Sequence, residues 1–332
     1  MKKLILAVVA LLVVAALAVP SLVLDKRYRG FTAPVDVEIA KGEGTRTIAN
    51  QLAKAGVIAS PYHLMIARAL RSSAKLQAGL YHFEKPSSPS EVFDRLVHGD
   101  VIHYEVTIPE GSNIFDVAAI AGKIPFLNSE KMLKILKDPT PVRDLDPKAP
   151  TLEGYLFPST YRLARHTTEE QLAHMMIAEF RKVWKQSAKA DENVHDVVTL
   201  ASMVEKESAA KDERPIVAGV YANRLLIGMK LDCDPTTIYA SMLDGRYRGK
   251  IYRSDLDSNN PYNTYKHVGM PPGPIANPGA GAIEAALKPD MDSKFLYFVA
   301  KPDGSGRHNF AADLSAHNRN VAEYRRGAAQ NK

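Results

Sequence analysis

The sequence predicts an α+β protein with a single N-terminal transmembrane helix, a small β-α-α-β module and a larger mixed α+β domain. Three observations favour this fold class. Residues 4–24 carry no charge, residues 35–100 show alternating strand and helix periodicities, and four prolines within residues 138–150 separate them from a segment of longer helices. A chain of 332 residues is long enough for two or three such domains.

The apolar N-terminal segment is long enough to cross a bilayer as a helix. It runs from Leu4 to Leu24, and the lysines of residues 1–3 mark a cytoplasmic end. Residues 16–18 (ALA) resemble a signal-peptide cleavage site, but the apolar run continues past them, which favours an uncleaved anchor. We therefore expect residues 1–24 to form a membrane anchor, residues 25–34 to form a polar stalk, and the remainder to be exported.

The module after the stalk begins with strict alternation of apolar residues at Val35, Val37 and Ile39, which is typical of a strand. A glycine turn follows, then a helix with an apolar stripe, a second helix over 62–70, a strand over 79–83 and a third helix over 90–97. This order resembles the LysM fold, a small module associated with glycans that contain N-acetylglucosamine. We assign residues 35–104 to this LysM-like module.

A weak internal repeat extends beyond this module at an offset of 69 residues. The matched positions are Val37, Ile39, Gly42, Ile48 and Ala49 with Val106, Ile108, Gly111, Val117 and Ala118. The repeated unit is a strand, a glycine turn and an amphipathic helix, and a chance match explains it equally well. Residues 105–150 are therefore interpreted as a junction with a second LysM-like half-unit, followed by a catalytic domain over 151–325.

Composition excludes several classes of function. Lys and Arg number 43 against 37 Asp and Glu, a formal charge of +6 without long basic runs, so we expect no nucleic-acid partner. The single cysteine, Cys233, lies between two aspartates, which disfavours a catalytic thiolate. HExxH, CxxC and phosphate-loop motifs are missing from the sequence, so we expect no metal and no cofactor. Ser208 and Lys211 fit one motif of serine acylases, but the K-T-G or K-S-G element is missing.

The segment 193–210 carries the clearest candidate for chemistry. Its apolar residues gather on one helical face, and Glu205 and Glu207 fall on opposite shoulders of that face, about 200° apart. The two carboxylates therefore cannot serve one reaction centre together. Burial beside Leu200 and Met203 would raise the pKa of Glu207 enough for a general acid. Periodicity alone does not choose between the two glutamates, nor does it exclude a solvated charged stretch.

Several motifs in order resemble the endolytic murein transglycosylase family, also called YceG-like. They are LEGYLFPSTY (152–161), LASMVEKESAA (200–210), ERPIVAGVYANRLLIGMKLDCDPTTIYA (213–240), NPYNTYKHVGMPPGPIANPGAGAIEAALKP (260–289) and FLYFVA (295–300). The resemblance implies a single-pass protein of the bacterial inner membrane, with a cytoplasmic N-terminus and a periplasmic catalytic domain. Its implied partners are peptidoglycan glycan strands and membrane-bound peptidoglycan synthases.

The resemblance also implies the reaction and its catalytic residue. The second glutamate of the E-K-E motif, Glu207, would act as acid and then as base to cleave the MurNAc-β-1,4-GlcNAc bond within nascent strands. The product would be a 1,6-anhydroMurNAc end, formed without water, so this lyase chemistry requires no second carboxylate. Predicted substrate-binding residues lie in the other motifs: Glu153, Tyr155, Asp234, Thr236, Asn263 and Tyr265.

Structural roles are open alternatives for some of these residues. Asp234 and Thr236 precede a helix as a cap would, and Glu153 fits a buried polar network. The sequence departs from the family pattern at Ser159, where an acidic residue is usual, and at Cys233, where a small hydroxyl residue is usual. Two other functions compete: a muramidase that admits water, and a non-catalytic peptidoglycan-binding scaffold. We expect Glu205→Gln to reduce activity much less than Glu207→Gln.

Overall fold

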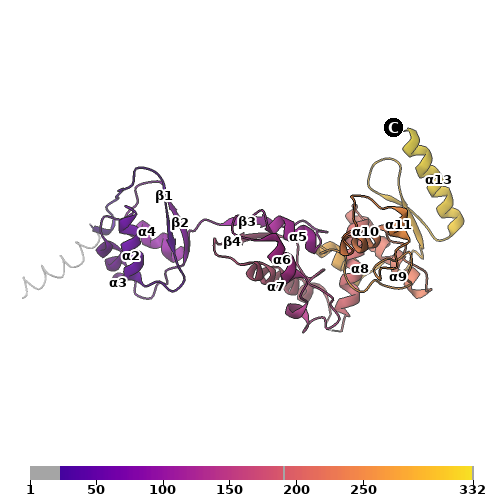
Figure 1. Cartoon of the computed structure of the whole chain (residues 1–332), viewed down its shortest axis with the longest axis horizontal. Coiled ribbons are helices and arrows are strands. Elements are labelled where there is room, and N and C mark those ends of the chain that lie inside the picture. Colours follow the sequence, from indigo (N-terminus) through magenta and orange to yellow (C-terminus); the bar gives the residue numbers. More distant parts are fainter. Residues whose placement is uncertain (1–22, 190, 331–332) are drawn as a thin grey trace, which may run out of the picture. The chain divides into compact units, whose positions relative to one another are not determined.

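The computed structural model describes residues 23–189 and 191–330, and the chain divides into two compact units (Figure 1). Unit 1 comprises the described residues up to Tyr104 together with Arg162–His166. Unit 2 comprises Glu105–Tyr161 and the described residues from Thr167 onward. Each unit has its own buried residues, so each is described by itself.

Unit 1 is built around a two-stranded antiparallel sheet covered by helices. Its elements are β1 (Val35–Ile39), α2 (Thr45–Lys54), α3 (Pro61–Leu70), β2 (Gly79–Phe83) and α4 (Pro89–His98). The sheet pairs Val35 with Phe83 and Ile39 with Gly79. Its apolar face packs with the helices around the fully buried side chains of Leu52 and Phe93. The predicted β-α-α-β order is present, but the order alone does not make this unit a LysM module.

A second β-α-α-β arrangement follows the first. Its elements are β3 (Tyr104–Thr107), α5 (Ile114–Ala121), α6 (Ser129–Leu136), the 3₁₀ turn η1 (Thr140–Val142) and β4 (Thr160–Leu163). β3 and α5 begin where the offset predicts, and both repeats turn at a glycine with positive φ, +89° at Gly42 and +74° at Gly111. Strand β4 pairs with β3, so the predicted half-unit is completed by a strand far along the sequence.

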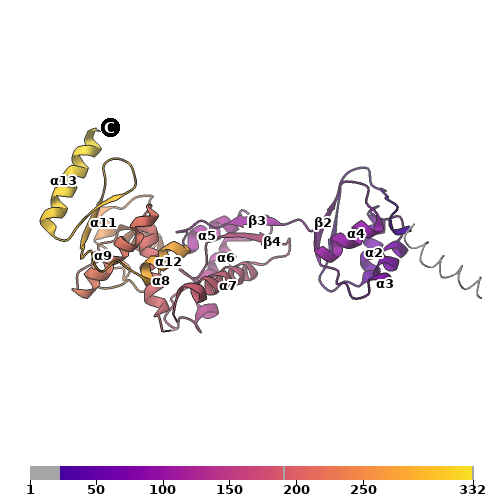
Figure 2. The ribbon, with the colours of Figure 1, turned by 180° about the vertical axis from the view of Figure 1, so that it is seen from behind.

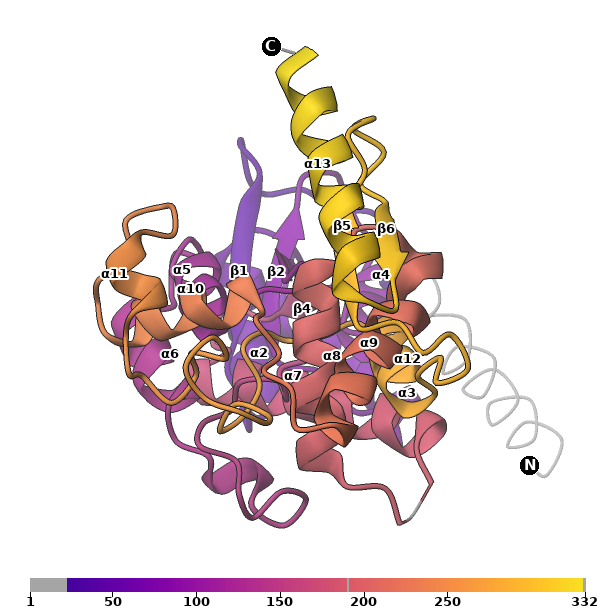
Figure 3. The same ribbon diagram turned by 90° about the vertical axis from the view of Figure 1, so that its right-hand side faces the viewer.

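The remainder of unit 2 is mainly helical. Its elements are α7 (Glu169–Ser187), α8 (Val194–Glu207), η2 (Lys211–Glu213), α9 (Arg214–Leu226), α10 (Asp234–Leu243), α11 (Arg253–Leu256), α12 (Ala280–Leu287), β5 (Tyr297–Ala300), β6 (His308–Ala311) and α13 (Leu314–Gln330). Helix α8 packs against α9, α10 and α12, and α13 lies along the antiparallel β5–β6 hairpin (Figures 2 and 3). This packing buries α8 over most of its length.

The ends of α8 explain where the E-K-E motif is placed. The side chain of Asn193 caps the first turn by accepting a hydrogen bond from the backbone N–H of Asp196. At the other end the helix stops at Glu207, because Ser208 adopts an extended backbone. The predicted helix is therefore correct but ends three residues earlier. As a result, Glu207 occupies the last helical position, where a side chain can reach beyond the helix.

The predicted fold class requires one correction. A mixed α+β architecture is present, but among residues 23–189 and 191–330 we find no helix with the length and apolar character needed to span a bilayer. The predicted transmembrane segment, residues 4–24, falls almost entirely on residues 1–22, outside the described part of the chain. The fold class that the described residues support is mixed α+β.

Candidate active site

A cavity of about 420 Å³ opens in unit 2 at the C-terminal end of α8. Segments distant in sequence converge on it: the ends of α8 and α9, the start of α10, the loop after α11, strand β5 and helix α13. Its lining residues include Glu207, Asp232, Asp234, Tyr265, Tyr297 and His317. Carboxyl, hydroxyl and aromatic groups on one concave surface are the kinds of group that bind a sugar.

Glu207 faces this cavity from the last position of α8. Its Oε1 accepts a hydrogen bond of 3.2 Å from the Tyr221 hydroxyl, and the Cys233 thiol also hydrogen-bonds to its carboxyl group. Burial raises the pKa of Glu207, because the desolvation of the carboxylate outweighs these two hydrogen bonds. A carboxyl group that keeps its proton toward neutral pH can act as a general acid. The alternative of a solvated charged stretch is therefore wrong for this residue.

Glu205 has a different environment on the opposite side of the helix. Its Oε1 lies 2.6 Å from Nη2 of Arg214, and its Oε2 accepts a 3.0 Å hydrogen bond from the backbone N–H of Gly279. The side chains of both ion-pair partners are buried, with 5% and 6% exposed. Glu205 thus ties α8 to the starts of α9 and α12, whereas Glu207 faces the cavity.

Two of the predicted binding residues line the same cavity as Glu207. The Tyr265 hydroxyl donates a 2.7 Å hydrogen bond to Oδ1 of Asp234, which joins the loop after α11 to the first residue of α10. Burial and this hydrogen bond raise the pKa of Tyr265, so the phenol stays protonated and acts only as a donor toward Asp234. Asp234 is exposed at the cavity wall.

Comparisons with known proteins bear on this site. The model of the YceG-like family matches residues 37–323. This chain belongs to the YceG-like family. An endolytic murein transglycosylase of Bacillus subtilis (strain 168) is 32% identical over 310 residues, covering 87% of this chain and 84% of that protein. One of Streptococcus pneumoniae R6 is 31% identical over 322 residues, covering 87% of this chain but only 58% of that protein.

A solved structure agrees with the sequence comparisons. The crystal structure of a YceG-like protein from Listeria monocytogenes superposes with a TM-score of 0.56 at 30% identity, covering 86% of this chain and 98% of that one. The resemblance predicted from the motifs is therefore confirmed. The names of the relatives are those of lytic transglycosylases, the enzyme class that the sequence predicts.

In this YceG-like chain, Thr236 and Asn263 hold the cavity wall from behind. Thr236 is fully buried, and its hydroxyl donates to the Cys233 carbonyl at 2.6 Å. Asn263 is also fully buried, and its side-chain N–H groups donate to the carbonyls of Leu256 and Ser258 at 3.0 and 2.8 Å. These contacts fix the start of α10 and the loop that carries Tyr265.

Glu153 and Tyr155 are both fully buried and lie outside the cavity lining. Oε1 of Glu153 accepts from Asn277 Nδ2 at 2.9 Å, and its Oε2 accepts from the Ile114 N–H at 2.9 Å. Burial raises the pKa of Glu153 to about 8. The Tyr155 hydroxyl donates to Asp146, which also contacts His195 at 2.7 Å. Glu153 therefore belongs to a buried polar network, which is the structural alternative to substrate binding.

Sequence reasoning missed several residues of the cavity. Arg224 lines the cavity, and Tyr221 contacts Glu207 from the same helix, α9, which packs against α8. Both lie within a quoted motif, yet neither was predicted as a site residue. Arg224 donates to the carbonyls of Leu231 and Leu296 at 2.9 and 2.6 Å, which holds β5 against the loop before α10. Tyr297 and His317 stack with ring centroids 5.0 Å apart. Tyr297 lies within the quoted motif FLYFVA, but no local pattern indicates that it meets His317, because the β5–α13 contact that joins them is tertiary.

Proposed function

We propose that this protein is an endolytic murein transglycosylase that cleaves the MurNAc-β-1,4-GlcNAc bond within glycan strands, with Glu207 as its acid and then its base. The observation that carries the proposal is the position of Glu207. It is a carboxyl group with a raised pKa, it faces a cavity lined by aromatic and polar groups, and it receives hydrogen bonds from Tyr221 and Cys233.

In the first step, protonated Glu207 gives its proton to the O4 atom of the leaving GlcNAc while the bond between C1 of MurNAc and O4 breaks. Positive charge develops at C1. In the second step, the Glu207 carboxylate takes the proton of the C6 hydroxyl as O6 bonds to C1. The products are a free 4-hydroxyl end and a 1,6-anhydroMurNAc end. Glu207 regains its proton, and no water is consumed.

Other cavity groups support the charges and positions that these steps require. The Asp234 carboxylate, oriented by the Tyr265 hydroxyl, would stabilise the positive charge at C1. The ring of Tyr297 supplies an aromatic face for a sugar, and its stacking on His317 fixes its orientation. The Tyr221 hydroxyl would hold the Glu207 carboxylate in place between the two steps.

We also propose that the site works outside the cytoplasmic membrane, since that is where peptidoglycan lies. The chemistry proposed for Glu207 does not depend on the cellular location of the protein. The peptidoglycan synthases that the family resemblance implies as partners stay a prediction. A test is co-purification of the full chain with synthases from a crosslinked cell envelope.

A water-using muramidase is the second candidate, and the structure supplies a specific reason to test it. Its second carboxylate cannot be Glu153, which lies outside the cavity lining. Asp232 and Asp234 both line the cavity with Glu207, but Asp232 forms an ion pair with Arg224 at 3.3 Å. Asp234 is therefore the residue that such a mechanism would use. A hydrolase would lose all activity on Asp234→Asn, whereas the transglycosylase would keep a reduced rate of the same product.

The deciding experiment is mass spectrometry of the products that the full chain releases from uncrosslinked peptidoglycan. Wild type, Glu207→Gln, Asp234→Asn and the surface control Glu284→Gln are assayed together. We expect fragments one water lighter than hydrolysis products from wild type and Glu284→Gln, and none from Glu207→Gln. Hydrated ends would establish the muramidase. No cleavage, while a known transglycosylase is active on the same substrate, would support the scaffold.

A further inference from the structure

A second cavity of about 220 Å³ lies on the other side of the E-K-E motif. It is formed by the end of α8, the first two turns of α10, the segment after α10 and the N-terminal turn of α5. Residues that line it include Lys206, Pro235, Tyr239, Met242, Tyr247 and Ile275. None of the predicted site residues lines this cavity.

The two cavities share a wall. Lys206 lines the second cavity and the next residue, Glu207, lines the first. In the same way Asp234 lines the first cavity and the next residue, Pro235, lines the second. The two cavities therefore lie on two sides of the end of α8 and the start of α10.

We propose that the second cavity is a glycan-binding subsite. The first cavity holds the sugars on one side of the scissile bond, and the second cavity holds those on the other side. This inference rests on the proposed function. A cut within a strand leaves sugar units on both sides of the broken bond, and both sides must be held for Glu207 to meet the bond between them. Two cavities on two sides of the end of α8 that carries Glu207 have this arrangement.

The second cavity offers the Lys206 ammonium, the Asp116 carboxylate and an aromatic ring, which suit a sugar that carries both a carboxylate and hydroxyl groups. Tyr247 offers a ring with 37% of the residue exposed, and a ring of this kind stacks on a sugar face. Lys206 Nζ donates to the Gly111 carbonyl at 3.1 Å, which orients its ammonium, and a lysine ammonium has two further protons to donate. In a peptide-bearing strand the peptide stem of a MurNAc unit supplies an anionic partner for this ammonium, and in a stripped strand the free lactyl carboxylate does.

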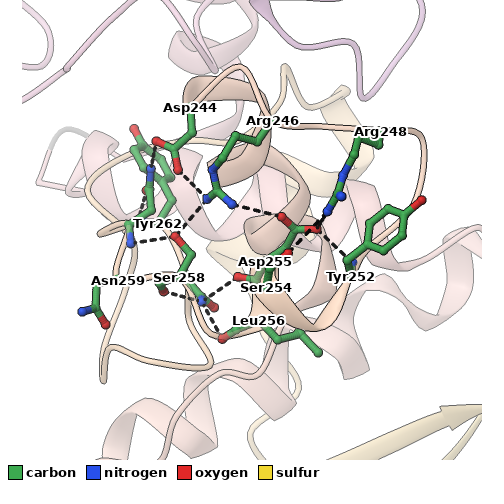
Figure 4. A network of polar contacts seen from close by, with 12 residues as sticks. Asp244, Arg246, Arg248, Tyr252, Ser254, Asp255, Leu256, Ser258, Asn259 and Tyr262 are labelled. Atoms are coloured by element: carbon green, nitrogen blue, oxygen red, sulfur yellow. Dashed lines mark hydrogen bonds and ion pairs between the residues drawn. The ribbon is translucent and has the colours of Figure 1, made fainter.

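Polar contacts hold two parts of the wall of this cavity. Tyr239 is almost fully buried, and its hydroxyl hydrogen-bonds to Glu153 beneath the cavity. Tyr247 stands between Arg246 and Arg248, and both arginines are paired with Asp255, at 3.3 and 3.7 Å (Figure 4). A ring presented by a fixed segment loses little freedom on binding, which favours affinity.

The test uses the full chain and two variants with matched controls. Tyr247→Ala removes the ring, and its control is Tyr324→Ala on α13, where the residue is 38% exposed. Lys206→Met keeps the stem but removes the ammonium, and its control is Lys185→Met, a lysine in the last turn of α7. Binding to soluble, uncrosslinked, peptide-bearing glycan strands is measured by titration with each change placed on the cleavage-deficient Glu207→Gln background.

We expect Tyr247→Ala and Lys206→Met each to weaken binding about tenfold, equivalent to about 1.4 kcal/mol, and both controls to leave it unchanged. In the cleaving enzyme, Tyr247→Ala should raise KM with kcat unaltered, because its ring lies in the second cavity and not beside Glu207. Lys206→Met should weaken binding less for strands stripped of their peptides than for peptide-bearing strands. In a stripped strand the lactyl carboxylate is the only carboxylate that the Lys206 ammonium of the unmodified site can meet.

Equal affinity of Tyr247→Ala and Tyr324→Ala for the strand would overturn the proposal, as would a fall in kcat with KM unchanged. This outcome is distinguishable from failure of the proposed function. If wild type binds strands but releases no anhydro products, the transglycosylase mechanism fails, while the titrations on the Glu207→Gln background still report whether the second cavity holds glycan.

Discussion

The two carboxylates of the E-K-E motif should respond in opposite ways when their charge is removed. Glu205→Gln takes the anionic partner from Arg214, whose guanidinium is buried and whose other acidic neighbour, Glu110, is 3.6 Å away and half exposed. Removing one member of a buried ion pair costs about 3–5 kcal/mol of the free energy of unfolding. Burial raises the pKa of both carboxyl groups, but only Glu205 has a buried cationic partner. Glu207→Gln leaves no buried charge without its partner, so stability should be unchanged or increased at neutral pH.

The single tryptophan gives a clean assay. Trp184 lies in α7 of unit 2 and is 9% exposed, so its fluorescence reports the unfolding of the unit that contains both glutamates. For a unit of this size, about 3–5 kcal/mol lowers the melting temperature by about 6–20 °C. Glu205→Gln should show this shift yet keep cleavage within about tenfold at 25 °C. Glu207→Gln should keep its melting temperature and lose about 10²–10⁴ in cleavage rate.

The control is Glu284→Gln on α12, whose side chain is 69% exposed, and we expect it to change stability by less than about 0.5 kcal/mol. Equal melting shifts for Glu205→Gln and Glu207→Gln would refute the reasoning. So would an active Glu207→Gln, or a Glu205→Gln variant that is as stable as wild type and inactive.

Three further predictions follow from buried groups of unit 2. Because the pKa of Glu153 is raised to about 8, the native state keeps a proton that the unfolded chain loses, and stability should fall by about 1.4 kcal/mol per pH unit between about pH 5 and 8. Glu153→Gln should remove this one-proton contribution from the slope in urea titrations followed at Trp184, while the raised pKa values of Glu205 and Glu207 keep contributions of their own. An unaltered slope would contradict the assignment. Tyr221→Phe removes a hydrogen bond that lowers the pKa of Glu207, so the alkaline limb of the cleavage rate should move to higher pH. An unshifted limb would show that the hydroxyl does not stabilise the carboxylate. Cys233 is fully buried, and burial raises its pKa, so a thiol reagent should label it only when unit 2 unfolds; rapid labelling of the native protein would contradict this.

The sequence by itself determined the local architecture. The apolar periods predict β1, α2, α3 and β2 in order, because each element must place its apolar side chains on one face. The same argument gives helix α8 and puts Glu205 and Glu207 on opposite sides of it. The repeat offset places β3 and α5 at their observed starts. The family resemblance, which rests on motifs read in order, then selects Glu207.

Only the tertiary structure decided what surrounds each of these residues. A helical wheel does not distinguish Glu205 from Glu207. In the structure Glu205 contacts Gly279 and Arg214, whereas Glu207 contacts Tyr221 and Cys233. Six polar residues in motifs were predicted to bind substrate, yet two of them stand behind the cavity wall and two lie outside the cavity lining. Thr236 and Asn263 belong to that wall, since a buried hydroxyl or amide must satisfy its hydrogen bonds within the protein.

The second cavity shows the same division. Lys206 and Pro235 each stand next to a predicted site residue, but their cavity exists only because α10, α8 and the N-terminal turn of α5 meet there. Periodicity reports which side of one element is apolar, and this is a local property of the chain. A cavity is the space left between several elements, so its position depends on contacts between residues far apart in sequence, which the pattern of any one segment does not contain.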